Sequence, residues 1–267
     1  GLELEANLGQ NPYRLGVIGS TDSHTALSSA EEDNFHGKLA TDSIPANKTS
    51  NFNDDGPGSS GWAMSASGMA AVWAESNTRS DIMDALERRE VYATTGPRIA
   101  VQFYGGPDFT EADLENADLH TLATARGVPM GGELHQTETP TFLVLATKDP
   151  EGANLDRIQM VKGWLDADGQ SQEKIFNLAW SDERPLNADG SLSDVGNSVN
   201  LKTGKVDNRI GAAQLAAAWA DPQFDPDQSA FYYVRVLQIP TARHSLLDAI
   251  ALGMDHATDQ PDTIQER

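Results

Sequence analysis

After Pro97 the chain alternates apolar and polar residues with a period of two, which is the pattern of half-buried β-strands. Ile99, Val101 and Phe103 show this alternation clearly. Further apolar runs that we expect to form strands are Thr141–Thr147, Arg157–Trp164, Lys174–Trp180 and Phe231–Ile239. Turns rich in Asp, Gly, Asn and Pro separate these runs. The succession of strands predicts an antiparallel β-sandwich-like domain over residues 98–267.

Residues 1–97 follow a different pattern, in which short apolar runs lead into loops and a helix. Arg14–Gly19 and Met69–Ala74 have the composition of buried strands. Arg79–Arg89 is expected to form an amphipathic helix, which Thr78 and Asp81 would cap at its N-terminus. This part of the chain therefore predicts an α/β unit, and the whole chain an α/β plus all-β protein.

Three segments complete the expected organisation. Residues 28–61 are polar and rich in Asn, Asp, Ser and Gly, and Asn53–Gly58 has the composition of a turn. We therefore expect a long surface loop with one helical turn. Arg243–Leu252 predicts a late amphipathic helix, and Asp255–Arg267 a polar tail.

The chain is strongly acidic, with 40 Asp and Glu against 19 Lys and Arg and a formal net charge of −21. Such a charge repels nucleic acids and anionic membranes, so neither is expected as a partner. An anionic substrate would have to be captured locally by a metal ion or an arginine. The chain has no cysteine, which excludes thiolate nucleophiles and Cys-ligated zinc.

The segment Gly19–Thr25 (sequence GSTDSHT) carries the clearest candidate chemistry. Asp22 and His24 follow an expected strand with one residue between them, and in extended backbone such residues point to the same side. A carboxylate and an imidazole would then converge on one cation. A divalent ion there would lower the pKa of a bound water and polarise an ester oxygen. The alternative is a capping aspartate beside a solvated histidine.

This segment also resembles the last metal-binding motif of PHP (polymerase and histidinol phosphatase) domains. The blocks that continue the resemblance are Glu31–Phe35, Ala66–Glu75, Arg88–Ile99, Lys148–Ile158 and Phe231–Pro240. Together they are similar to the C-terminal part of a bacterial PHP-like family, the domain of unknown function numbered 3604. The similarity extends from about residue 10 to the end of the chain.

The resemblance implies a distorted PHP-type α/β barrel with two or three divalent ions (Zn, Mn or Fe), of which residues 1–97 would form the C-terminal portion. Phosphoester hydrolysis is the activity implied, through metal-bound hydroxide. A related branch includes carbaryl hydrolases, which keeps carboxylic or carbamate esters open as substrates. Asp22 and His24 would be metal ligands, and the Thr95–Pro97 turn would join the barrel to the sandwich.

The chain lacks the His-x-His pair that opens a PHP domain and has too few strands before Gly96 to close a barrel. Zinc or manganese needs about four to six ligands. We therefore expect the chain to be the C-terminal portion of a longer protein, whose missing N-terminal part supplies the other ligands. The fragment alone would be weakly active or inactive.

The sequence thus favours a metal-dependent hydrolase of a small-molecule ester. Arg98, beside the Thr95–Pro97 turn, is a candidate for binding an anionic substrate, although a surface arginine at a domain junction is the alternative. A rival interpretation is a non-catalytic binding module, which aromatic side chains on an open face of the sandwich would favour. The lack of cysteine and the family resemblance favour a periplasmic or exported location.

Overall fold

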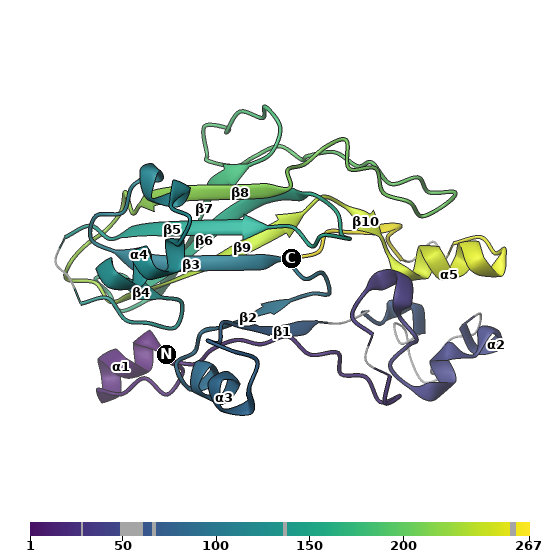
Figure 1. Cartoon of the computed structure of the whole chain (residues 1–267), viewed down its shortest axis with the longest axis horizontal. Helices are drawn as coiled ribbons and strands as arrows, with labels where there is room; N and C mark the ends of the chain where they lie inside the picture. The colour runs from purple at the N-terminus through teal and green to yellow at the C-terminus, as the bar shows by residue number, and fades with distance from the viewer. Residues whose placement is uncertain (28, 49–60, 66–67, 136–137, 257–259) are drawn as a thin grey trace.

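A computed structural model describes residues 1–27, 29–48, 61–65, 68–135, 138–256 and 260–267. Strands β3 to β9 form two antiparallel sheets that lie one behind the other in Figure 1. The first sheet has the order β4-β3-β5-β8, with bounds Val128–Pro129, Ala100–Gly106, Thr141–Thr147 and Gln214–Ala220. The second has the order β7-β6-β9, with bounds Ser171–Trp180, Leu155–Leu165 and Ala230–Gln238. The predicted antiparallel strands are confirmed.

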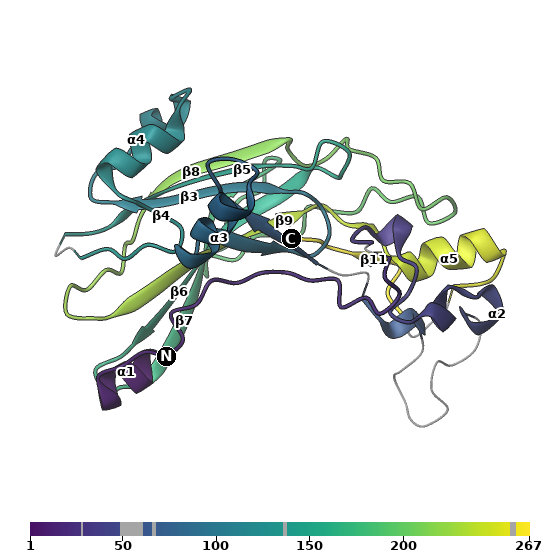
Figure 2. The same ribbon diagram turned by 60° about the horizontal axis from the view of Figure 1, so that its bottom comes forward.

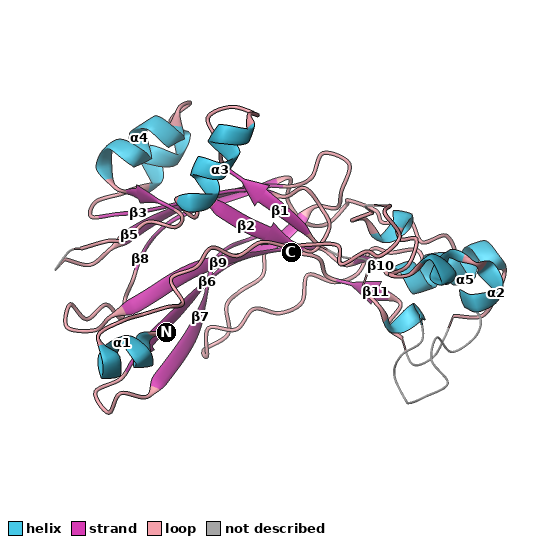
Figure 3. Ribbon diagram, turned by 90° about the horizontal axis from the view of Figure 1, so that it is seen from below, coloured by secondary structure: helices cyan, strands magenta, loops and turns pink. Residues whose placement is uncertain are grey.

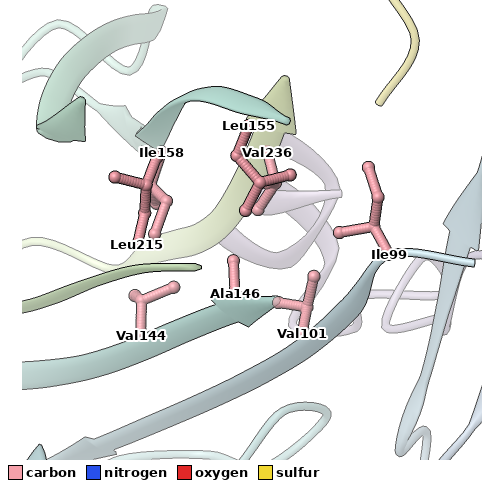
Figure 4. Packing of buried hydrophobic residues seen from close by; sticks show 8 residues of the cluster. All are labelled: Ile99, Val101, Val144, Ala146, Leu155, Ile158, Leu215 and Val236. Atoms are coloured by element: carbon pink, nitrogen blue, oxygen red, sulfur yellow. The ribbon is translucent and has the colours of Figure 1, made fainter. Parts of the chain in front are cut away.

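The two sheets are joined by a core of aliphatic side chains that come from both of them (Figure 4). The contributing residues are Ile99, Val101, Val144, Ala146, Leu155, Ile158, Leu215 and Val236. Burial of one such Val, Leu or Ile side chain contributes about 1.5–3 kcal/mol, so this layer accounts for much of the stability of the sandwich-like arrangement.

The outer face of the first sheet is covered by α4 (Leu119–Arg126) and the short 3-10 helix η4 (Glu111–Glu115). Figure 3 shows α4 on the side of the first sheet that faces away from the second. Leu119 and Ala123 of α4 pack with Tyr104 and Leu143 of the sheet. The second sheet has no comparable helix among the described residues on its outer face, apart from contacts of α1 (Leu2–Leu8) with β6.

Before β3, the chain forms a small antiparallel hairpin of β1 (Met69–Val72) and β2 (Val91–Thr94), with α3 (Arg79–Glu87) between the two strands. The expected cap of the helix is present, because Thr78 Oγ1 accepts a hydrogen bond from the Asp81 N–H at 3.2 Å. The remaining helices before β1 are short: η1 (Glu32–Asn34), η2 (Ala40–Ser43), α2 (Pro45–Lys48) and η3 (Gly61–Ala63). The expected turn at Asn53–Gly58 lies outside the described residues.

The prediction of a buried strand at Arg14–Gly19 is wrong. Residues 14–19 run as an irregular extended segment (Figure 2), and Leu15 and Val17 are 71% and 67% exposed. Among the described residues no strand pairs with this segment. Its backbone therefore has no ladder partner, and no neighbouring strand covers its side chains. Within the same residues the sheets form no barrel.

The end of the chain is more ordered than the expected polar tail. After β10 (Thr241–Ala242), helix α5 (His244–Leu252) is followed by β11 (Thr263–Ile264), which pairs with β10. Backbone hydrogen bonds at 2.7–3.0 Å then tie residues 262–267 to Arg243, Gln238 and Thr95. This main-chain pairing, which polar composition does not reveal, fixes the segment. None of the described helices is both long and apolar enough to cross a membrane.

Candidate functional site

The candidate ligands Asp22 and His24 lie in a loop that follows the extended segment. Asp22 has φ +47°, a left-handed conformation. The extended geometry expected of residues i and i+2 is therefore absent at Asp22. Instead, His24 Nδ1 lies 2.9 Å from the main-chain oxygen of Asp22.

This contact determines which nitrogen of His24 is available to a ligand. A carbonyl oxygen can only accept a hydrogen bond, so Nδ1 donates the proton, and in the neutral ring Nε2 carries the lone pair. Histidines that bind metals are commonly held in this way, with the other ring nitrogen donating to a carbonyl or carboxylate. His24 is exposed, and its N–H donates to the Lys38 oxygen at 2.8 Å. In this tautomer Nε2 is the ring nitrogen that keeps a free lone pair.

The Asp22 carboxylate forms an ion pair with the ammonium group of Lys38. The hydrogen bond from Lys38, and then its charge, lower the pKa of Asp22 below its ordinary value. Asp22 is therefore anionic at neutral pH, as a metal ligand must be. The Lys38 ammonium neutralises the carboxylate in the place where a metal cation would do so.

Asp22 and His24 fit part of a divalent-metal site. One imidazole and one carboxylate suit zinc, manganese or iron, but a complete set needs about four to six donors. Within the described ranges no three His, Cys, Asp or Glu side chains come together as a metal-binding group. His36, in the loop after His24, is exposed. The described residues thus contain two candidate ligands and not the whole set.

Arg98, the candidate substrate-binding residue, lies beside the turn at Thr95–Pro97. Its guanidinium group is 2.9 Å from Glu31 Oε1 and 3.8 Å from Asp149 Oδ2. Its backbone N–H also donates to Asp149 Oδ2 at 2.7 Å. The side chain is 61% exposed, so it is reachable from solvent while two carboxylates partly neutralise it.

Sequence analysis did not identify a pair of acidic residues near the same turn, Glu32 and Glu266. Thr95 Oγ1 donates to the Glu266 carboxylate, and the His244 N–H donates to that of Glu32. Burial, and then the neighbouring Glu32, raise the pKa of Glu266 to about 7. Such paired carboxylates with a displaced pKa are a feature of acid–base sites as well as of buried structural pairs.

A cleft of about 270 Å³ opens next to Glu32, between η1 and α5. Its lining includes His36, Asp33 and Asp248, together with the apolar side chains of Phe35 and Leu252. The two carboxylates make this cleft unfavourable for an anion unless a cation is also bound. It is better suited to a neutral or cationic molecule.

Comparison with known proteins places the whole chain in one family. A family described as "Protein of unknown function (DUF3604)" matches residues 1–267. The chain belongs to the DUF3604 family. No curated protein and no solved structure matches it. Membership in DUF3604 confirms the family that the sequence blocks resembled, while the relation to PHP metallohydrolases is a proposal.

Proposed function

We propose that this DUF3604 protein is a metal-dependent hydrolase of ester substrates, with Asp22 and His24 as two of the metal ligands. The observation that best supports the proposal is the hydrogen bond from His24 Nδ1 to the Asp22 main-chain oxygen, which leaves Nε2 as the donor atom. The anionic state of Asp22 supplies the second donor.

The divalent ion, Zn, Mn or Fe, would lower the pKa of a coordinated water and polarise the ester oxygen. The roles of the protein are to hold the two ligands in the required protonation states and to position the substrate. Binding would require Lys38 to leave Asp22, because one carboxylate cannot keep the full attraction of both cations. An ion pair this exposed costs little to break.

The exposed apolar segment supports the proposal that further polypeptide completes the site. Leu15, Val17 and Ile18 lie next to the Asp22 loop and are all more than half exposed. Exposed apolar side chains beside a candidate site are a feature of contact regions. We infer that the N-terminal part of a PHP-like barrel would pack here and contribute the remaining ligands.

A phosphoester is the favoured substrate, because Arg98 offers a guanidinium group accessible to an anion. A carboxylic or carbamate ester is the second candidate. The acidic lining of the cleft, Asp33 and Asp248, favours that neutral substrate. The two candidate substrate classes differ in charge. Activity measured on a phosphate ester and a carboxylate ester of the same alcohol therefore distinguishes between them.

The test uses the intact protein, with Asp22→Ala and His24→Ala variants, on p-nitrophenyl phosphate and p-nitrophenyl acetate. Each variant is expected to lose at least about tenfold in metal-dependent kcat/KM, since loss of even an outer-shell partner of a metal costs about 10–100-fold. Lys38→Met is the matched control. It removes the ammonium competitor and keeps both ligands, so activity should be retained or increased. Full activity in both ligand variants would contradict the proposal.

A further inference from the structure

The outer face of the second sheet carries large apolar side chains in contact with solvent. Phe231 and Tyr233 on β9 are 49% and 46% exposed, and Ile175 on β7 is 43% exposed. Val161 of β6 lies opposite both Ile175 and Tyr233 and is almost fully buried. Alternate residues of a strand share one face. Side chains from three adjacent strands therefore form one continuous surface, termed here the aromatic face.

The two aromatic rings of this face are nearly parallel. Their centroids are 6.3 Å apart and their planes differ by 11°. Gly163 lies opposite Phe231 in the register of β6 and β9, and a Cβ atom at position 163 would overlap the Phe231 ring. The glycine thus allows the Phe231 ring to lie over the strand, so that the ring presents its other side to solvent. Phe231 and Tyr233 are thus both exposed on this face, and the two rings are termed here the platform.

A row of hydrogen-bonding side chains borders the platform on the same face. Gln159 lies between Asn177 and Arg235 in the strand register. Arg235 Nη2 donates to Gln159 Oε1 at 2.6 Å, and Gln159 Nε2 donates to Asn177 Oδ1 at 2.9 Å. These bonds hold the amide and guanidinium groups in fixed positions, and the guanidinium retains further donors. On the other side of the platform, Glu173 lies opposite Gly163 and provides acceptors.

We propose that the aromatic face binds a neutral glycan with a flat, equatorially linked backbone, such as a β-1,4-glucan or a xylan. The negative face of an aromatic ring attracts the weakly positive C–H groups on the broad side of a sugar ring. Hydroxyl groups at the edge of the sugar would find the donors and acceptors that border the platform. Nearly parallel rings on one sheet face can stack on successive sugar units of an extended chain.

Charge supports this ligand over other polymers that stack on aromatic rings. The net charge of −21 opposes binding of nucleic acids and of anionic membranes, whereas a neutral glycan pays no such penalty. A protein partner held by hydrophobic contacts would favour concave pockets that bury its anchor side chains. The glycan-binding face is independent of the proposed metal site.

The test is affinity electrophoresis of the folded chain in native gels that contain hydroxyethyl cellulose, soluble xylan or no polysaccharide. The wild-type chain should be retarded by at least one of the two polymers. Phe231→Ala and Tyr233→Ala are each expected to weaken binding by about tenfold or more, because each removes one stacking ring. Tyr13→Ala removes an aromatic ring outside the two sheets that is even more exposed, at 65%, and should leave retardation unchanged.

The Gly163→Ala variant tests the aromatic platform without disturbing the fold. Its methyl group would displace the outer end of an exposed side chain and leaves the strand backbone intact, so the chain should stay folded while glycan binding weakens. Circular dichroism checks the fold. The proposal is overturned if neither polymer retards the wild-type chain, if Phe231→Ala is retarded like the wild type, or if DNA or anionic vesicles bind and the glycans do not.

Discussion

Lys162→Met should lower the free energy of unfolding by about 3–5 kcal/mol, the cost of leaving one partner of a buried ion pair alone. Lys162 and Asp221 are each only 2% exposed, and Lys162 Nζ lies 2.6 Å from Asp221 Oδ2. Methionine is unbranched like lysine and only one atom shorter, so it keeps most of the packing. The loss would therefore report the uncompensated carboxylate and not a cavity.

The surroundings of this pair explain why a carboxylate is tolerated there at all. The Tyr232 hydroxyl donates to Asp221 Oδ2 at 2.7 Å, and the Gln223 N–H donates to Oδ1 at 2.9 Å. Lys162 Nζ also donates to the Gln223 oxygen at 2.6 Å and lies over the rings of Trp164 and Tyr232. Two remaining hydrogen bonds cannot replace a full positive charge inside the sandwich.

Urea unfolding of four proteins tests this prediction: the wild type, Lys162→Met, Lys174→Met and the double variant Lys162→Met/Asp221→Leu. Lys174 is an exposed lysine on β7 beside an aromatic ring, so its loss should cost less than about 0.5 kcal/mol. The double variant should recover much of the stability, because both buried charges are gone. Equal stability of the two single variants would refute the assignment.

Glu266→Gln should remove a pH dependence of stability that the wild type shows between about pH 4.5 and pH 7. The folded-state pKa of Glu266, raised to about 7, is higher than its ordinary value of 4.5. The native state therefore binds this proton more tightly than the unfolded state, and the contribution of Glu266 to stability is largest below pH 4.5. It falls as the pH rises to about 7 and then levels off, by on the order of 3 kcal/mol.

Glutamine imitates the protonated glutamic acid, because its amide can donate to Glu32 while its oxygen accepts from Thr95. The variant should match the wild type near pH 4.5 and be more stable by on the order of 3 kcal/mol at pH 8. Thermal or urea unfolding across this range measures the difference. Glu183→Gln, an exposed residue, controls for the loss of one negative charge. A constant difference across the pH range would show that Glu266 is not protonated preferentially in the native state.

Strands with a strong local pattern could be predicted from the sequence. The expected strand Thr141–Thr147 agrees with β5, since its apolar side chains face the core on one side and the helical cover on the other. Strand β8 was missed. Its central residues, Ala216, Ala217 and Ala218, lack the branched and aromatic side chains that mark a strand. Its pairing with β5 makes it a strand, and that contact is distant in the chain.

Two further errors, at residues 14–19 and 262–267, have the same cause, which is that pairing depends on partners remote in the sequence. Residues 14–19 have the composition of a buried strand but find no pairing strand among the described residues. Residues 262–267 have the composition of a free tail, yet hydrogen bonds to distant main-chain groups fix them. Local periodicity carries no information about either outcome.

The candidate site likewise has a part that could be predicted from the sequence and a part that could not. Asp22 and His24 could be proposed as ligands from their spacing in the sequence. The left-handed conformation of Asp22, which changes the geometry of the pair, could not be predicted. Glu32 and Glu266 come from opposite ends of the chain. Glu32 lies in a block of the family resemblance that gives it no role, and Glu266 lies in none of the blocks. Their proximity depends on how the end of the chain packs against the Thr95 turn.

The most direct test of the metal-site proposal follows the His24 ring by ¹⁵N NMR while Zn²⁺ is added to the intact protein. We expect the Nε2 resonance to shift on binding while Nδ1 keeps its proton, and Asp22→Ala to weaken the effect by at least about tenfold. Lys38→Met should strengthen it. A His24 resonance that stays unchanged at saturating Zn²⁺, or that shifts equally in the Asp22→Ala variant, would contradict a metal site shared by these two residues.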